Sequence, residues 1–217
     1  MEIQEEQYPD LLQLLGTVTP LSADFQQRIQ DQLLTEKLPG RHLLLRPGET
    51  SRRIYFIRKG LLRSYGIDRN GKQSTNWFIS QGELMISVCS FFNQKPAEEY
   101  IEVLSEATLQ SLSWNQLNSF YADFPESNLI GRILIQKYYT LSEQRSTLMR
   151  TYNPLERYHA LLEQHPKIEQ QTTQTNIATY LGLSRETLSR MKTRLLRNRQ
   201  AANSLGHPTT TNPWAGS

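Results

Sequence analysis

Residues Thr173–Arg199 read TQTNIATYLGLSRETLSRMKTRLLRNR and decide the architecture of the C-terminal part of this 217-residue chain. Ile177 and Leu181 share one face of a short predicted helix, and Gly182 permits a sharp turn after it. Ser184 is a favourable N-cap for a second helix that begins at Arg185. The order helix, tight turn, helix is the helix-turn-helix layout.

The second predicted helix has one apolar face and one polar face. On a wheel of about 100° per residue, its apolar residues Leu188, Met191 and Leu195 fall within about a 60° arc. The opposite face carries the polar residues Glu186, Ser189, Arg190, Thr193 and Arg197. Arginine can contact guanine O6 and N7 together, and glutamate can accept a hydrogen bond from cytosine N4. The pattern therefore predicts a helix that enters the major groove of DNA, with a merely solvated charged face as the alternative.

The charge distribution favours a polyanionic partner for the C-terminal half. The chain has 24 Lys and Arg against 21 Asp and Glu overall. Residues 1–131 carry 12 basic and 16 acidic side chains, whereas residues 132–217 carry 12 and 5. A basic half of this kind suits nucleic acid. The hydrophobic fraction of 37% is that of a globular protein and excludes collagen-like, disordered and disulfide-stapled classes.

Neither a membrane nor a disulfide is expected. No apolar run approaches the ~20 residues that a membrane helix needs, and the N-terminus is acidic, so we expect a cytoplasmic protein. Cys89 is the only cysteine and cannot by itself supply a disulfide, a cysteine-ligated zinc or an iron–sulfur site. We expect Cys89 to be a buried small apolar residue.

The N-terminal half predicts a helix followed by many short strands. Apolar residues recur every four positions from Leu21 to about Leu34, and Pro39-Gly40 ends this helix. Short apolar runs then alternate with turns such as Arg46–Glu49; the runs are residues 42–45, 54–57, 77–79, 100–104 and 107–112. Asn70-Gly71 is a strong hairpin signal. Closely spaced strands of this kind predict an antiparallel roll or barrel.

A long helix is predicted to follow Pro125. A helix of roughly 27 residues between two domains cannot bury its apolar stripe within one chain along its whole length, so a helix pair in a homodimer is expected. The alternative is a helix packed along its own roll. The residues that we assign to the dimer contact are Ile130, Ile133, Leu134, Tyr138 and Leu141.

The predicted fold class is α+β, with four segments. Residues 1–125 form N-terminal helices and the roll, residues 126–152 the dimerisation helix, and residues 153–200 the helix-turn-helix domain, which begins at Asn153-Pro154. Residues 201–217 hold Gly, Pro, Ser, Thr and Asn with few large apolar side chains, which predicts a disordered tail.

The run Leu183–Arg190, LSRETLSR, closely resembles the recognition-helix motif of the Crp/Fnr family of bacterial transcription regulators. Arg46–Glu49, Ile54–Gly60, Gly71-Lys72 and Gly82–Leu84 resemble the family's cyclic-nucleotide-binding-type roll. The order of roll, long helix and helix-turn-helix also matches, so the resemblance covers roughly residues 20–199.

The resemblance implies roles for individual residues and partners. Arg185 and Arg190 would read guanines and Glu186 a cytosine. Phosphate or flanking contacts would come from Thr175, Ser184, Ser189, Lys192, Thr193 and Arg197. The implied partners are double-stranded DNA with a palindromic site, a second copy of the chain, RNA polymerase and a small-molecule effector that the sequence does not identify.

Two departures from the family pattern stand out. Relatives that bind cyclic AMP hold its phosphate with an Arg-Ser pair, whereas this chain reads Pro96-Ala97-Glu98-Glu99-Tyr100 in that region. Carboxylates repel a phosphodiester, so cyclic AMP is not the expected effector. The candidate effector pocket comprises Gly82, Glu83, Leu84, Glu98 and Glu99, with Glu83 at the family's ribose-binding glutamate. The chain also passes from Arg199 straight into the polar tail, so the wing hairpin is expected to be reduced or missing.

Other functions compete with this one. A cyclic-nucleotide- or haem-responsive regulator is one alternative, since His42 or His159 could serve as an axial haem ligand. A cupin-like metal-dependent enzyme is another, but His42 is the only histidine of the roll. No Gly-x-Ser-x-Gly, His-Glu-x-x-His or P-loop motif is present, so we expect no catalytic site, metal or cofactor. A pure interaction module with residual DNA binding is the third alternative.

Overall fold

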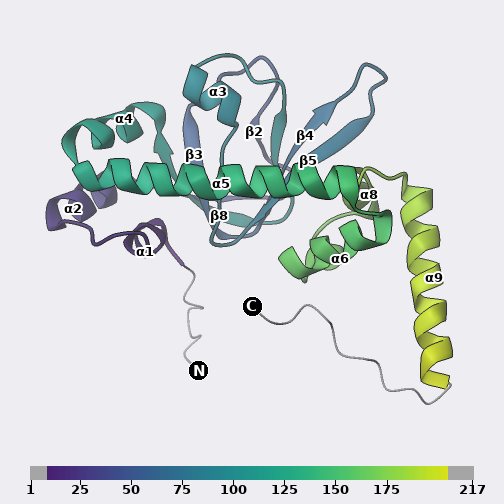
Figure 1. Ribbon diagram of the computed structural model, residues 1–217. Helices are drawn as coiled ribbons and strands as arrows, with labels where there is room; N and C mark the ends of the chain where they lie inside the picture. The colour runs from purple at the N-terminus through teal and green to yellow at the C-terminus, as the bar shows by residue number, and fades with distance from the viewer. Residues whose placement is uncertain (1–8, 205–217) are drawn as a thin grey trace, which may run out of the picture.

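The computed structural model describes residues 9–204, with side chains through residue 198. An antiparallel roll is crossed by one long helix, and a helical domain follows at the C-terminal end (Figure 1). The predicted α+β class with roll, long helix and helix-turn-helix is therefore confirmed. None of the helices in the described residues is both long and apolar enough to cross a membrane.

The roll consists of two antiparallel four-stranded sheets. The strand order of the first is β1 (Leu34–Leu38), β8 (Ala107–Ser113), β3 (Arg53–Lys59) and β6 (Leu84–Met85). The order of the second is β2 (Leu43–Leu45), β7 (Tyr100–Val103), β4 (Leu61–Ile67) and β5 (Gln73–Ser80). Both sheets contribute fully buried side chains to one core, among them Ile57, Leu62, Ile101 and Leu109. The Asn70-Gly71 hairpin is confirmed, because β4 pairs with β5 on either side of it.

Three helices cover the other side of the first sheet. They are α1 (Leu11–Gly16), α2 (Ala23–Gln32) and α4 (Trp114–Asp123), whereas the short α3 (Val88–Asn93) follows β6. Phe25 of α2 meets Phe120 of α4 edge to face, with ring centroids 5.5 Å apart. Phe56 and Leu112 of the sheet belong to the same buried cluster.

Local sequence patterns misplace several features of this half. The predicted helix ends at Gln32, and Leu34 begins β1, which pairs with β8 from Leu34–Ser111 to Leu38–Ala107. A strand partner 69 to 77 positions away is invisible to helical periodicity. The predicted strands also omit β4 and β6. Cys89 is exposed rather than buried, because α3 turns Ser90 and Phe91 inward instead.

The long helix α5 spans Pro125–Thr151 and packs on its own chain along its first half (Figure 1). Ile130 is buried, and Leu134 and Tyr138 pack against the same cluster. The Tyr138 hydroxyl accepts a hydrogen bond from the Leu84 backbone amide at 2.7 Å. The assignment of Ile130 to a partner helix is therefore wrong, since its side chain is only 4% exposed.

The C-terminal domain contains α6 (Pro154–Gln164), α7 (Ile168–Gln171), α8 (Gln174–Tyr180) and α9 (Arg185–Ser204). Asn153 caps α6, because its side chain accepts hydrogen bonds from the Leu155 and Glu156 amides. Helix α9 continues through residues 201–204, which were expected to belong to the tail. The rest of the predicted tail lies outside the described residues. The described part of the chain ends with α9 at residue 204, so the expected loss of the wing also falls outside the described residues.

Gly60, between β3 and β4, provides a test of the roll. Its φ is +110°, and an added Cβ would lie 2.6 Å from the Ala107 Cβ. We expect Gly60→Ala to lower the free energy of unfolding by about 2–4 kcal/mol, from backbone strain and overpacking combined. Urea denaturation measures this loss. Gly16→Ala is the control, since nothing lies within 4 Å of its added Cβ; equal losses in the two variants would contradict the prediction.

Candidate nucleic-acid interface

Helix α8 and the turn after it are fixed by local hydrogen bonds. The Thr173 hydroxyl accepts from the Asn176 amide at 3.2 Å and so caps the start of α8. Gly182 has a φ of +71°, and the Leu183 amide donates back to the Ala178 carbonyl at 2.9 Å. This hydrogen bond ends α8 with a residue at positive φ, a conformation that favours glycine. Helix α8, the turn at Gly182 and helix α9 therefore confirm the predicted helix-turn-helix.

The start of α9 is capped as predicted. The Ser184 hydroxyl accepts from the Thr187 amide at 3.1 Å. A hydrogen bond from its own backbone and another from Ser184, together with the positive charges of Arg185 and Arg190, lower the pKa of the Glu186 carboxyl. Glu186 is therefore an ionised acceptor at neutral pH.

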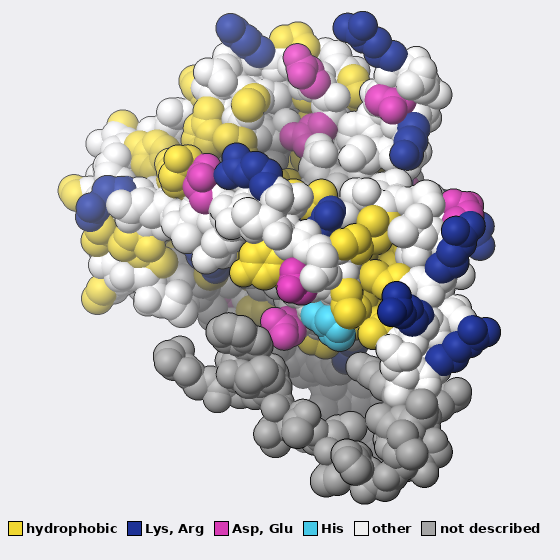
Figure 2. All heavy atoms as spheres, turned by 45° about the vertical axis from the view of Figure 1, so that its right-hand side comes forward, with side chains coloured by type: hydrophobic (Ala, Val, Ile, Leu, Met, Phe, Trp, Pro, Cys, Tyr) yellow, Lys and Arg dark blue, Asp and Glu magenta, His cyan; other side chains and the backbone are white. Residues whose placement is uncertain are grey.

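The two faces of α9 also separate as the helical wheel predicts. Leu188 is fully buried, and Met191 and Leu195 pack against the same cluster, which includes Ile177 and Leu181. The polar face is exposed: Arg185, Glu186, Ser189, Arg190, Thr193 and Arg197. Figure 2 shows Lys and Arg side chains along the right-hand side of the molecule, the side on which Figure 1 places α9.

Some of the predicted phosphate contacts are already used within the chain. Lys192 forms an ion pair with Glu169 and donates to Gln174 Oε1 at 3.2 Å. Burial raises the pKa of Glu169, but hydrogen bonds from Lys192 and Tyr158 outweigh this effect and lower it. Lys192 thus ties α9 to α7 and is not a free phosphate ligand in this arrangement.

The other hydroxyls of the predicted phosphate set differ in availability. The Ser184 hydroxyl serves as the helix cap, and Thr193 Oγ1 donates to the Ser189 carbonyl at 3.0 Å. Thr175, by contrast, is exposed in the first turn of α8. Thr175, Ser189 and Arg197, which are all exposed, are therefore the members of the set that are best placed to meet a phosphate.

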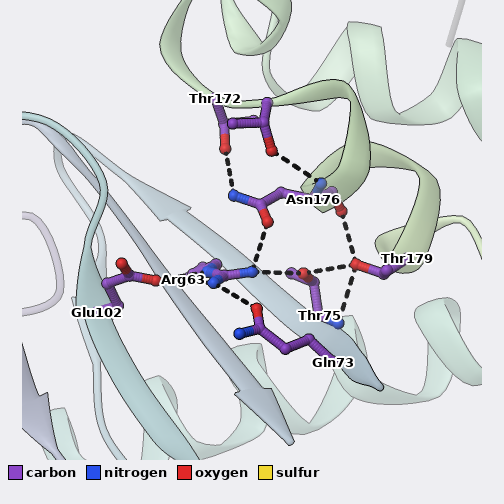
Figure 3. A network of polar contacts seen from close by, with 8 residues as sticks. Arg63, Gln73, Thr75, Glu102, Thr172, Asn176 and Thr179 are labelled. Carbon is purple, nitrogen blue, oxygen red and sulfur yellow. Dashed lines mark hydrogen bonds and ion pairs between the residues drawn. The ribbon is translucent and has the colours of Figure 1, made fainter. Parts of the chain in front are cut away.

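A buried arginine attaches α8 to the roll, a feature that the sequence analysis missed. Arg63 on β4 is 5% exposed and donates from Nε to Glu102 Oε2 at 2.8 Å. Its Nη1 donates to Asn176 Oδ1 of α8 at 2.6 Å, and its Nη2 to Gln73 Oε1 at 2.8 Å (Figure 3). An arginine in the middle of a strand was the only sequence signal for this network.

Further contacts strengthen the attachment of α8 to β5. The hydroxyls of Thr75 and Thr179 lie 2.9 Å apart, and the Thr75 amide donates to Thr179 Oγ1 (Figure 3). Phe78 of β5 and Tyr180 of α8 stack in a tilted pair with ring centroids 5.0 Å apart. The helix-turn-helix therefore packs directly on the outer face of the second sheet.

Comparison with known proteins agrees with this architecture. The family model described as "Cyclic nucleotide-binding domain" matches residues 35–124, and the one described as "Bacterial regulatory proteins, crp family" matches residues 173–199. Together the two matches span more than half of the chain. The chain belongs to the Crp family of bacterial regulatory proteins. A search of the curated proteins finds no match.

Solved structures with the Crp/Fnr fold resemble the chain over most of its length. CLP of Xanthomonas campestris, described as a c-di-GMP-responsive global regulator, has a TM-score of 0.65 at 16% identity, with 82% of this chain and 93% of that one covered. FixK2 of Bradyrhizobium japonicum also has a TM-score of 0.65 at 16% identity, covering 76% and 85%. A regulator from Eubacterium rectale has a TM-score of 0.65 at 18% identity, covering 83% and 84%.

A cavity of about 1690 Å³, open to solvent, lies between the Crp-family roll, α5 and α6. Three of the predicted effector residues line it: Glu83, Leu84 and Glu99. Gly82 and Glu98 are not part of the lining. The Glu83 carboxylate accepts from the Ser80 amide at 2.7 Å, and Glu99 accepts from the Ser87 hydroxyl at 2.8 Å. Both carboxylates are thus already engaged within the roll.

Acidic side chains outnumber basic ones in the described lining of the cavity. Its described lining carries five carboxylates: Glu83, Glu99, Glu143, Glu156 and Glu163. Arg145 is the only Lys or Arg of that lining, and two of its nitrogens donate to the Asn76 and Tyr180 carbonyls. Its Nη1 and the buried Ser64 hydroxyl have no partner. These two groups are buried donors of the described lining that remain available to a ligand.

The histidines and acids of the described residues form no metal site. No group of three or more His, Cys, Asp or Glu side chains in that part of the chain could hold a metal ion. His42 and His159, the two histidines considered as haem ligands, are both exposed.

Arg63 should be far more important for stability than a surface arginine. We expect Arg63→Met to lower the free energy of unfolding by about 2–4 kcal/mol, because Glu102 loses its buried ion-pair partner. Arg46→Met is the matched control, since the Arg46–Glu49 pair is about half exposed and should contribute less than about 1 kcal/mol. Urea denaturation of both variants measures the difference; an Arg63→Met protein as stable as Arg46→Met would refute the role of the network.

Proposed function

We propose that the chain is a sequence-specific DNA-binding transcription regulator and acts as a homodimer. The observation that carries the proposal is the division of α9, whose apolar side is buried while Arg185, Glu186 and Arg190 are exposed near its N-terminus. A recognition helix reads base edges with its N-terminal residues, and a dimer places two such helices in successive major grooves of a roughly palindromic site. This role involves no catalysis.

Each exposed side chain of α9 has a distinct part in the proposal. Arg185 and Arg190 donate to guanine O6 and N7, and the ionised Glu186 accepts from cytosine N4. Arg197 and Thr175 contact phosphates, which position the helix without specifying sequence. Lys192 keeps its internal ion pair with Glu169 and stabilises the domain instead.

The proposed dimer contact lies on the outer side of α5. Ile135 and Tyr139 are 53% and 66% exposed and lie one turn apart on one face. Ile133 and Leu141, assigned to the contact from the sequence, are half-buried. A second copy of α5 would cover the exposed pair while Ile130, Leu134 and Tyr138 remain in the core of their own chain.

The cavity in the roll would receive a neutral or cationic effector rather than cyclic AMP. The five carboxylates of its described lining, against Arg145 as the one Lys or Arg there, support this proposal, since carboxylates repel a phosphodiester. RNA polymerase is the proposed protein partner when the regulator is bound to its site.

Removing Arg190 should affect specificity, whereas removing Arg197 should affect general affinity. We expect Arg190→Ala to weaken binding to a selected palindromic duplex roughly 10- to 100-fold, with little change on random DNA, since a bidentate base contact discriminates by about 1–3 kcal/mol. Arg197→Ala should weaken binding to both the palindromic and the random DNA. It should also make the slope of log binding constant against log salt concentration (the salt slope) shallower by about 1. Fluorescence anisotropy at several salt concentrations measures both. Equal losses on the two DNAs for Arg190→Ala would contradict base reading.

A charge on the outer side of α5 should separate the dimer. We expect Tyr139→Glu to shift the protein toward a monomer, because two buried carboxylates would face each other in the helix pair. Lys137→Glu lies on the opposite side of α5 by helical spacing and should leave the dimer intact. Sedimentation velocity across a concentration series distinguishes the two. A Tyr139→Glu dimer as tight as the wild type would place the contact elsewhere.

A further inference from the structure

The tip of the β4–β5 hairpin is tightly folded. The Asp68 carboxylate accepts from the Asn70 amide at 2.8 Å and from the Lys72 amide at 2.9 Å. The Asp68 amide in turn donates to the Lys72 carbonyl at 2.9 Å. The tip is therefore held in one shape, and its only carboxylate points back to its own backbone.

This tip presents two basic side chains to solvent. Arg69 and Lys72 are both exposed, and neither takes part in an ion pair within the described residues. Because Asp68 is occupied by backbone amides, no nearby carboxylate of the tip competes for the two cations. A guanidinium and an ammonium without ion-pair partners suit phosphate oxygens.

The hairpin lies directly beside the proposed DNA-reading elements. A groove of about 470 Å³ is shared by Lys72 and Gln73 of the hairpin with residues of α8 and the start of α9. The partners from these helices are Thr175, Asn176, Thr179, Ser184, Arg185 and Glu186. Figure 1 shows the hairpin projecting from the roll on the side where α8 ends and α9 begins.

The position of the hairpin is fixed relative to α8. Gln73, which follows Lys72, accepts from Arg63, and the same guanidinium donates to Asn176 of α8 (Figure 3). Thr75, three residues after Lys72, is hydrogen-bonded to Thr179. Lys72 is thus held at a constant place beside the helix-turn-helix, and Arg69 lies at the tip of the same fixed hairpin.

We propose that Arg69 and Lys72 contact the DNA backbone next to the base pairs that α9 reads. This inference rests on the proposed function of α9. Phosphate contacts beside a recognition helix fix its register on the duplex. A duplex whose base edges meet Arg185 also brings its sugar-phosphate backbone to the groove that Lys72 lines. The roll thereby takes part in DNA binding itself.

The test compares Arg69→Ala/Lys72→Ala with the wild type and with Lys37→Ala. Lys37 is an exposed basic residue of β1 in the other sheet and serves as the matched control. Affinities for a selected palindromic duplex and for random DNA are measured across a salt series. We expect losses of roughly 5- to 10-fold per removed side chain at 0.1 M salt on both DNAs, and a salt slope smaller by about 2. Lys37→Ala should bind as the wild type does.

The outcomes separate this inference from the proposed function. Wild-type affinity and salt slope in the double variant would overturn the hairpin contact, while the effect of Arg190→Ala on specificity would still support base reading by α9. Unchanged DNA affinity with a loss of transcription activation would also overturn it, by assigning the hairpin to a protein partner. Absence of any preference for the palindromic duplex in the wild type would instead reject the proposed function.

Discussion

Burial of Leu188 determines which side chains of α9 can reach a partner. Leu188 packs with Ile177 and Leu181 of the preceding helix, so the rotation of α9 about its axis is fixed. The residues on the far side are then exposed as a consequence of helix geometry and not of their own contacts. Gly182 makes this packing possible, because its positive φ turns the chain sharply between the two helices.

The same domain is attached to the roll through α8, which gives the roll a physical route to the DNA-reading helix. Arg63 joins Glu102 of the roll to Asn176 of α8, and Phe78 packs on Tyr180. A molecule in the cavity could shift α9 only if it bound two arrangements of these contacts with different affinity. Tyr180 lines that cavity and also lies under the Arg145 guanidinium. Because it packs on Phe78 as well, the same side chain belongs to the cavity and to the attachment of α8 to the roll.

The sequence predicts local features well and misses features that depend on distant contacts. The turn at Gly182, the Ser184 cap and the wheel of α9 are local, and all are confirmed. The β1 strand was missed because its partner β8 is far along the chain. Periodicity also could not show that α5 packs on its own roll through Ile130, since an apolar stripe does not name its partner.

In the candidate site, too, local features were predicted from the sequence and features that depend on distant contacts were missed. Sequence reasoning found the polar face of α9, but it assigned Lys192 to DNA because a lysine in a basic helix gives no sign of an internal acid such as Glu169. The Arg63 network and the hairpin cations depend on the packing of two domains, which no single-sequence pattern encodes. Of the acids that the sequence analysis placed in the candidate effector pocket, Glu83 and Glu99 line the cavity, whereas Glu98 does not.

The most direct test is the affinity of the purified wild-type protein for a palindromic family-type duplex and for random DNA, at one salt concentration, with and without cyclic AMP. We predict tight binding to the palindrome, binding at least 10³-fold weaker to random DNA, and no change on adding the nucleotide. Equal affinity for the two duplexes would contradict base reading by α9. Specific binding that requires cyclic AMP would contradict the proposal that the cavity receives a neutral or cationic effector.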